Sequence, residues 1–113
     1  RLELVKRGES SVVYKDFAHS PSKLKATSSA MKKQYTHRAL VACMELHTFS
    51  SLNKDFLKEY LGAMDTPDIA VVYFSKAAIA HKKLEDISVE QVHKAFGRQD
   101  LKVFTDSKDL QLF

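Results

Sequence analysis

Glycine, proline, cysteine and tryptophan are scarce or missing: the 113 residues include three glycines, two prolines, one cysteine and no tryptophan. The chain has neither a G-x-x-x-x-G-K-[ST] phosphate loop nor a G-x-G-x-x-G motif, so it has no glycine-rich backbone to cradle a triphosphate. Its single cysteine, Cys43, cannot form an internal disulfide. Because Cys43 lies in an apolar run, we expect it to pack in a core, in a reducing cytoplasm.

Long apolar runs are also missing. None approaches the roughly 20 residues that a membrane-spanning helix needs, and the N-terminus has no basic-then-apolar secretory pattern. We therefore expect a cytoplasmic protein without a membrane partner. A hydrophobic fraction of 44% and a charged fraction of 28% are typical of an ordinary globular domain, and residues 1–113 suffice for one domain with a real core.

Charge and histidine do not gather into a recognisable site. The net charge is only +4, and the lysines of one predicted helix have no aromatic residues between them, so they indicate a solvated face and no nucleic-acid partner. They can still attract an anionic ligand. A zinc site needs three or four converging ligands, and the five histidines are scattered, so we predict no metal site.

The order of the expected elements predicts an α/β domain. Residues 1–7 alternate between polar and apolar, which predicts a half-buried strand, and residues 11–17 are predicted to form a short buried strand that pairs with it in a hairpin. Apolar residues recur at helical spacing from 21 to 35. Residues 38–46 and 68–74 are nearly continuous apolar runs, typical of strands covered on both faces. Helix and strand alternate with short connections, which predicts a mostly parallel sheet with an N-terminal antiparallel hairpin strand.

The remaining segments complete this alternation. Apolar residues at positions 56, 57, 60, 61 and 64 predict a helix, capped by Asn53 or Ser51, whose stripe faces the core. Residues 75–86 are a longer connection of unassigned role. Ser88 and Gln91 form a capping-box pair that opens a helix ending at Gly97. A short strand at 101–104 and a last helix from Thr105 or Asp106 follow.

Two polar loops follow two of the predicted strands. Asp16 and His19 come after the strand at 11–17, beside a helix that opens at Ser20-Pro21 with a favoured N-cap and first residue. Carboxyl ends of strands and helix N-termini are where α/β sheets bind anionic ligands. A local capping or pairing role for Asp16 is an equally good interpretation.

The second loop follows the strand at 38–46. Its imidazole, hydroxyl and amide groups suit phosphate or a polar, peptide-like substrate. Its candidates are His47, Thr48, Ser50, Ser51 and Asn53. A capping or surface role is the alternative for His47. No Ser-His-Asp or Cys-His arrangement can be inferred, so the chain alone does not resemble a complete enzyme, and we assign it no catalytic residue in isolation.

These stretches resemble a family. Residues 16–21, Asp-Phe-Ala-His-Ser-Pro, resemble the D-[YF]-[AG]-H-x-P signature that opens the C-terminal domain of Mur ligases, the ATP-dependent amide-forming enzymes of peptidoglycan synthesis. Residues 1–3, Arg-Leu-Glu, are similar to the R-x-E that ends the linker from their central ATPase domain. Residues 45–51 sit where alanine-adding members carry a Q-P-H-R-Y-S-R-like loop. The resemblance implies a Rossmann-like three-layer domain.

Departures from these motifs indicate a branch of the family. Thr48 and Ser51 stand where alanine-adding members have arginines, and Ser20 replaces a second histidine. This resembles the branch that joins a preformed peptide, L-Ala-γ-D-Glu-meso-diaminopimelate, to UDP-N-acetylmuramate through an acyl-phosphate in peptidoglycan recycling, which serves cell shape and division. An alanine-adding ligase domain and a non-catalytic α/β interaction module are the alternatives.

The resemblance also implies roles and partners. Arg1 and Asp16 would contact the nucleotide, with Asp16 on the ribose, and His19 would lie near the phosphates. His47 and its loop would face the substrate. ATP and Mg²⁺ would be held mainly by the central ATPase domain, and UDP-N-acetylmuramate would bind an N-terminal uridine-nucleotide domain, so the isolated domain should not turn over. The family has a later strand, so we expect the chain to be truncated at its C-terminus.

Overall fold

A computed structural model describes residues 3–8, 11–16, 20–47, 52–53 and 55–112. The chain begins with a hairpin and a helix, which are β1 (Glu3–Arg7), β2 (Val12–Lys15) and α1 (Pro21–Gln34). The middle contains β3 (Val41–Glu45), the short 3-10 helix η1 (Leu57–Tyr60) and β4 (Ile69–Tyr73). The last third contains α2 (Lys76–His81), α3 (Val89–Phe96), β5 (Lys102–Phe104) and α4 (Ser107–Leu112).

The strands form two sheets. β3, β4 and β5 are parallel and neighbour one another in that order, with Val41 of β3 opposite Ile69 of β4. β1 and β2 form an antiparallel pair of their own, with an irregularity in register between Leu4 and Lys6. The predicted α/β class, a parallel sheet with an N-terminal antiparallel hairpin, is therefore confirmed, with the hairpin as a separate sheet.

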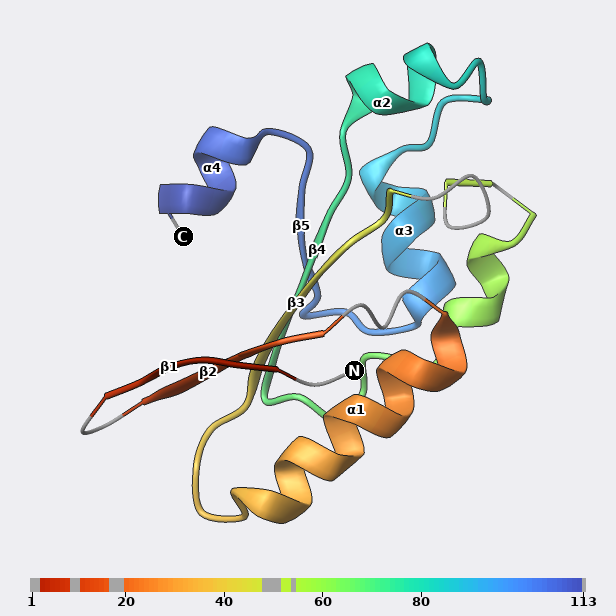
Figure 1. Ribbon diagram of the computed structural model, residues 1–113. Helices are drawn as coiled ribbons and strands as arrows, with labels where there is room; N and C mark the ends of the chain where they lie inside the picture. The colour runs from red at the N-terminus through yellow and green to blue at the C-terminus, as the bar shows by residue number, and fades with distance from the viewer. Residues whose placement is uncertain (1–2, 9–10, 17–19, 48–51, 54, 113) are drawn as a thin grey trace.

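Helix α1 begins where its capping residues predict. The Ser20 side chain accepts a hydrogen bond from the Lys23 N–H, and Pro21 takes the first helical position. Leu24 and Ser28 are its buried residues. The helix runs below the sheet and returns the chain from the end of β2 to the start of β3 (Figure 1). Among the described residues, no helix has the length and apolar character to cross a membrane.

The core lies between β4, α3 and the segment around η1, on one side of the three-strand sheet, while α4 lies on the other side (Figure 1). Tyr60, Phe74 and Phe96 are fully buried, and the rings of Tyr60 and Phe96 stack with centroids 5.1 Å apart. Three consecutive residues of β4 are buried, as expected for a central strand covered on both faces. The buried core that stabilises the fold is therefore centred on β4, α3 and the segment around η1.

Helix α3 has the ends that its sequence predicts. Ser88 accepts from the Gln91 N–H, and the Gln91 side chain accepts from the Ser88 N–H, which completes the capping box. Gly97 ends the helix with φ of 69°. A Cβ atom at this position would lie 2.6 Å from Leu61 Cδ1, so both conformation and space favour glycine here.

Three expectations from the sequence are wrong. The helix predicted over 56–64 is only the single turn of η1, because the chain turns at Gly62 with φ of 79°, and Leu61 is 70% exposed instead of buried. β2 is half-exposed rather than buried. β3 is not covered on both faces, because Val41 is 55% exposed and Cys43 is exposed as well. In addition, the connection 75–86 contains the helix α2, capped by the Ser75 side chain.

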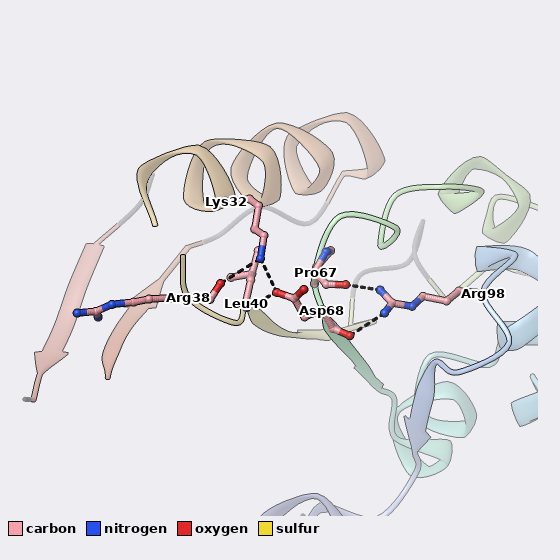
Figure 2. A network of polar contacts seen from close by, with 6 residues as sticks. All are labelled: Lys32, Arg38, Leu40, Pro67, Asp68 and Arg98. Carbon is pink, nitrogen blue, oxygen red and sulfur yellow. Dashed lines mark hydrogen bonds and ion pairs between the residues drawn. The ribbon is translucent and has the colours of Figure 1, made fainter. Parts of the chain in front are cut away.

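A polar network joins the segments that precede the three parallel strands (Figure 2). Asp68 Oδ2 accepts from the Leu40 N–H at 2.6 Å and from Lys32 Nζ at 2.7 Å. Arg98 Nη1 donates to the carbonyls of Met64 and Pro67, and its Nη2 donates to the carbonyl of Asp68. The guanidinium therefore satisfies three backbone acceptors that have no regular ladder partner.

Replacing Arg98 should destabilise the fold. We expect Arg98→Ala to lower the free energy of unfolding by about 2–4 kcal/mol, because three carbonyls lose their donor. Arg98→Lys keeps the charge but cannot reach three acceptors with a planar fork, so it should recover less than half of the loss. Urea unfolding measures both, with exposed Lys94→Ala on α3 as the matched control. If Arg98→Ala were as stable as Lys94→Ala, the hydrogen bonds from Arg98 to the three carbonyls would not stabilise the fold.

Asp68 should make the free energy of unfolding depend on pH in the acid range. The hydrogen bond from the Leu40 N–H, with that from Lys32, lowers the pKa of Asp68 below its ordinary value. Its stabilising contribution is therefore present above the unfolded-state pKa of about 4, and it is lost as the pH falls through the lower folded-state pKa. Urea unfolding from pH 7 to pH 2.5 should show wild type and Asp68→Asn converging in acid. Exposed Glu85→Gln is the control, and a constant gap between wild type and Asp68→Asn would refute this assignment.

Candidate functional site

A cavity with a volume of about 930 Å³ lies between β2, α1 and β3. Most of its wall is apolar, with contributions from Val12, Leu24, Met31, Ala42 and Met44. Ligand sites in proteins have this order of size, and they combine apolar walls with a few polar groups. The polar groups decide whether this cavity is a candidate site.

Asp16 and His47 line this one cavity from different strands. Asp16 follows the last residue of β2, and His47 follows β3 by two residues. The structure thus brings Asp16 and His47, one residue from each of the two polar loops, to the same cavity. Their predicted ligands stay predictions.

A hydrogen bond from α1 orients the Asp16 carboxylate. Thr27 Oγ1 donates to Asp16 Oδ2 at 2.8 Å, in a half-buried setting. A carboxylate accepts about four hydrogen bonds, so this contact fixes its direction without exhausting its capacity. The sequence gives no sign that Thr27 has a role at the site. Thr27 lies eleven residues after Asp16, inside α1, and this spacing alone does not predict a contact between them.

His47 is exposed and makes a local contact. Its Nδ1 lies 3.2 Å from the Glu45 carbonyl oxygen, an arrangement that suits a protonated Nδ1 donating to the carbonyl. That contact turns the ring while leaving Nε2 on the opposite side of the imidazole. This geometry fits both interpretations of His47, a surface role and contact with the substrate.

Aromatic and basic groups stand along another part of the wall. The hydroxyls of Tyr14 and Tyr35 are 2.7 Å apart, and the Arg38 guanidinium lies over the Tyr35 ring at 5.4 Å. The hydrogen bond with Tyr35 lowers the pKa of Tyr14, and the same bond raises the pKa of Tyr35. This contact joins β2 to the end of α1.

Cys43 corrects an expectation from the sequence. It was predicted to be buried in the core, but it is exposed on β3 and lines the cavity. Desolvation by the surrounding atoms raises the pKa of its thiol, and the charge of Glu45 adds to this effect. A thiol with a raised pKa is a weak nucleophile near neutral pH, so nothing here makes Cys43 a catalytic group.

Asn53 lies apart from the cavity. Its Oδ1 accepts hydrogen bonds from the N–H groups of Asp55 and Phe56, so Asn53 caps the turn that leads into η1. This agrees with the capping alternative, and Asn53 lines a separate hollow with Asp55, Phe56 and Glu59. The other predicted site residues, Arg1, His19, Thr48, Ser50 and Ser51, lie outside the described residues.

Among the polar groups of the cavity, the Asp16 carboxylate suits one particular part of a nucleotide, its ribose. A carboxylate such as Asp16 suits the hydroxyls of a ribose. Within the described ranges, no three histidine, cysteine or acidic side chains come together in a way that could hold a metal ion. The described part of the site therefore offers a carboxylate that suits ribose hydroxyls.

Three curated proteins illustrate what the chain resembles. A UDP-N-acetylmuramate--L-alanine ligase of Sulfurihydrogenibium sp. (strain YO3AOP1) is 34% identical over 88 residues, 78% of the chain and 19% of the ligase. That of Chlorobium chlorochromatii (strain CaD3) is 35% identical over 95 residues, 78% of the chain and 20% of the ligase. That of Lactobacillus delbrueckii subsp. bulgaricus is 31% identical over 102 residues, 88% of the chain and 22% of the ligase.

The homologues indicate a domain of the Mur ligase family, which is a family of enzymes. The parallel sheet with its antiparallel hairpin is consistent with the C-terminal domain of such a ligase. The chain spans about a fifth of the length of the curated relatives it matches. No protein-family model and no solved structure matches it. The names of these relatives specify alanine, so the predicted tripeptide branch is not confirmed.

Proposed function

We propose that the chain is the C-terminal domain of an ATP-dependent ligase that joins an amine-bearing substrate to UDP-N-acetylmuramate in the cytoplasm. The supporting observation is that Asp16, within the resemblance to the family signature, lies on a ligand-sized cavity and is oriented by Thr27. The identity to alanine-adding ligases over most of the chain supports the same family.

Each described site residue has a role in this proposal. Asp16 accepts hydrogen bonds from the ribose hydroxyls of the nucleotide, and Thr27 holds its carboxylate in the accepting direction. His47, at the carboxyl end of β3, faces the reacting groups. ATP, with Mg²⁺ held mainly by a central ATPase domain, supplies the phosphoryl group that activates the carboxylate of UDP-N-acetylmuramate. The domain then completes the site by closing on its neighbours, a common device for specificity.

L-Alanine is the amine substrate that the relatives favour, because all three named above are alanine-adding ligases. A second candidate is the tripeptide L-Ala-γ-D-Glu-meso-diaminopimelate. It is favoured by Thr48 and Ser51, which stand where the alanine-adding motif has arginines that would pair with a free amino-acid carboxylate. The two candidates share the family chemistry and differ only in the amine.

The decisive experiment uses the full-length protein that carries this chain. It is incubated with ATP, Mg²⁺ and UDP-N-acetylmuramate, with either L-alanine or the tripeptide, and phosphate release is recorded. Release that depends on alanine supports the first assignment, and release that depends on the tripeptide supports the second. Release with neither, or a gene that encodes these residues without a phosphate-loop domain upstream, would overturn the ligase proposal.

The contact between Thr27 and Asp16 gives a matched pair of variants in the same assay. Thr27→Val removes the donor while keeping the shape, so we expect the KM for ATP to rise roughly fivefold. Thr27→Ser keeps the hydroxyl and should stay within about twofold of wild type. Thermal unfolding of both variants controls for folding. An unchanged KM in a well-folded Thr27→Val protein would mean that Asp16 does not contact the nucleotide.

A further inference from the structure

The carboxyl end of β4 lies beside the carboxyl end of β3. The two strands are paired in parallel, and the Leu46 N–H donates to the Tyr73 carbonyl at 2.9 Å, which continues their pairing one step past β3. The same register sets His47 level with Ser75, on neighbouring strands that run about 4.8 Å apart. Residues 75 and 76, to which the sequence assigned no role, therefore stand at the same edge of the sheet as His47, in the upper part of Figure 1 where β4 leads into α2.

Lys76 brings a positive charge to this edge. The Ser75 side chain accepts a hydrogen bond from the Ala78 N–H at 3.2 Å, which fixes the start of α2 and makes Lys76 its first residue. The Lys76 side chain is 51% exposed, and its Nζ lies 3.4 Å from Oδ2 of Asp86, whose side chain is 72% exposed. An ion pair between exposed groups contributes little to stability. A carboxylate of a ligand can therefore replace Asp86 as the partner of Lys76.

A cation at this edge matches what the proposed amine substrates carry. L-Alanine and the tripeptide both have a free carboxylate close to the reacting amine, and a bound carboxylate is held best by a charged donor. Thr48 and Ser51, in the loop after His47, are neutral. Lys108 also follows a strand of the sheet, but that strand is β5, which is separated from β3 by β4. Lys76 follows β4 itself, so its charge is the closer one to a substrate at His47.

We infer that Lys76 is a substrate-binding residue, whose ammonium group pairs with the carboxylate nearest the reacting amine. Asp86 pairs with this ammonium group before the substrate binds and is replaced by the substrate carboxylate. His47 and Lys76 then face the amine substrate from two paired strands, while Asp16 contacts the nucleotide. This inference rests on the proposed function and extends it, because it names the residue that recognises the amine substrate.

The test uses the full-length protein, the phosphate-release assay and the amine that supports turnover. Lys76→Gln removes the charge, so we expect the KM for the amine to rise at least about tenfold. Lys76→Arg keeps the charge and should recover most of this loss. The KM values for ATP and for UDP-N-acetylmuramate should stay within about twofold of wild type in both variants. Lys108→Gln is the matched control and should leave all three KM values within about twofold, and thermal unfolding shows whether each variant is folded.

The ion pair with Asp86 provides a variant with the opposite effect. Asp86→Asn removes the competing carboxylate, so the KM for the amine should fall by roughly twofold. If the ion pair had only a structural role, Asp86→Asn and Lys76→Gln would change this KM in the same direction. That result would overturn the inference.

An amide analogue of the amine distinguishes a carboxylate contact from any other. L-Alaninamide, or the tripeptide amidated at the free carboxyl group of its D-Glu residue, lacks the charge that Lys76 recognises. With this analogue, wild type and Lys76→Gln should have kcat/KM values within about twofold of each other. A loss with the analogue as large as with the natural amine would contradict a carboxylate contact, and a rise only in the KM for UDP-N-acetylmuramate would do so by placing a phosphate at Lys76.

The failure of this inference is distinguishable from the failure of the proposed function. If wild type turns over and Lys76→Gln has an unchanged KM for the amine, the inference alone is wrong. If wild type turns over with neither amine, the proposed function is wrong and this inference falls with it.

Discussion

The hydrogen bonds of Asp68 and Arg98 set where the three parallel strands begin. Parallel strands cannot be joined by a tight turn, so no hairpin geometry fixes their register. Instead, Asp68 holds the Leu40 N–H just before β3, and Arg98, just before β5, holds the carbonyls that precede β4 (Figure 2). Lys32 adds α1 to the same cluster through its ion pair with Asp68. The position of α1, and with it one wall of the cavity, therefore depends on this network.

The network and the candidate site occupy opposite ends of the strands. The amino ends carry the side chains that bind backbone groups, and the carboxyl ends lead to Asp16 and His47. Open α/β sheets generally place ligands at the carboxyl ends, because the loops there are not needed to hold the sheet. In this chain the division lets the loops after β2 and β3 carry polar groups without weakening the core around Tyr60, Phe74 and Phe96.

Local signals in the sequence were reliable and patterns that depend on distant packing were not. Ser20, the Ser88–Gln91 pair and Gly97 mark helix ends because each acts on backbone groups within four residues. The helical spacing around residue 60 correctly indicated burial of Tyr60, but it gave only one turn of helix. There the backbone bends at Gly62, whose N–H bonds to the Phe96 carbonyl, a partner that no local pattern contains. An apolar run likewise suggested a buried β3, although Val41 and Cys43 are in fact exposed.

The sequence by itself determined the order of the strands and of helices α1, α3 and α4, the α/β class, and the resemblance of residues 16–21 to a ligase signature. It also determined the caps of α1 and α3, because all of these follow from periodicity and from neighbours along the chain. Tertiary structure decided the rest. It left Cys43 exposed on β3, brought Thr27 to Asp16, set Asn53 apart as a cap, and separated the hairpin from the sheet. Each of these depends on which surfaces meet in space, and contacts between residues far apart in the chain leave no periodic trace in it.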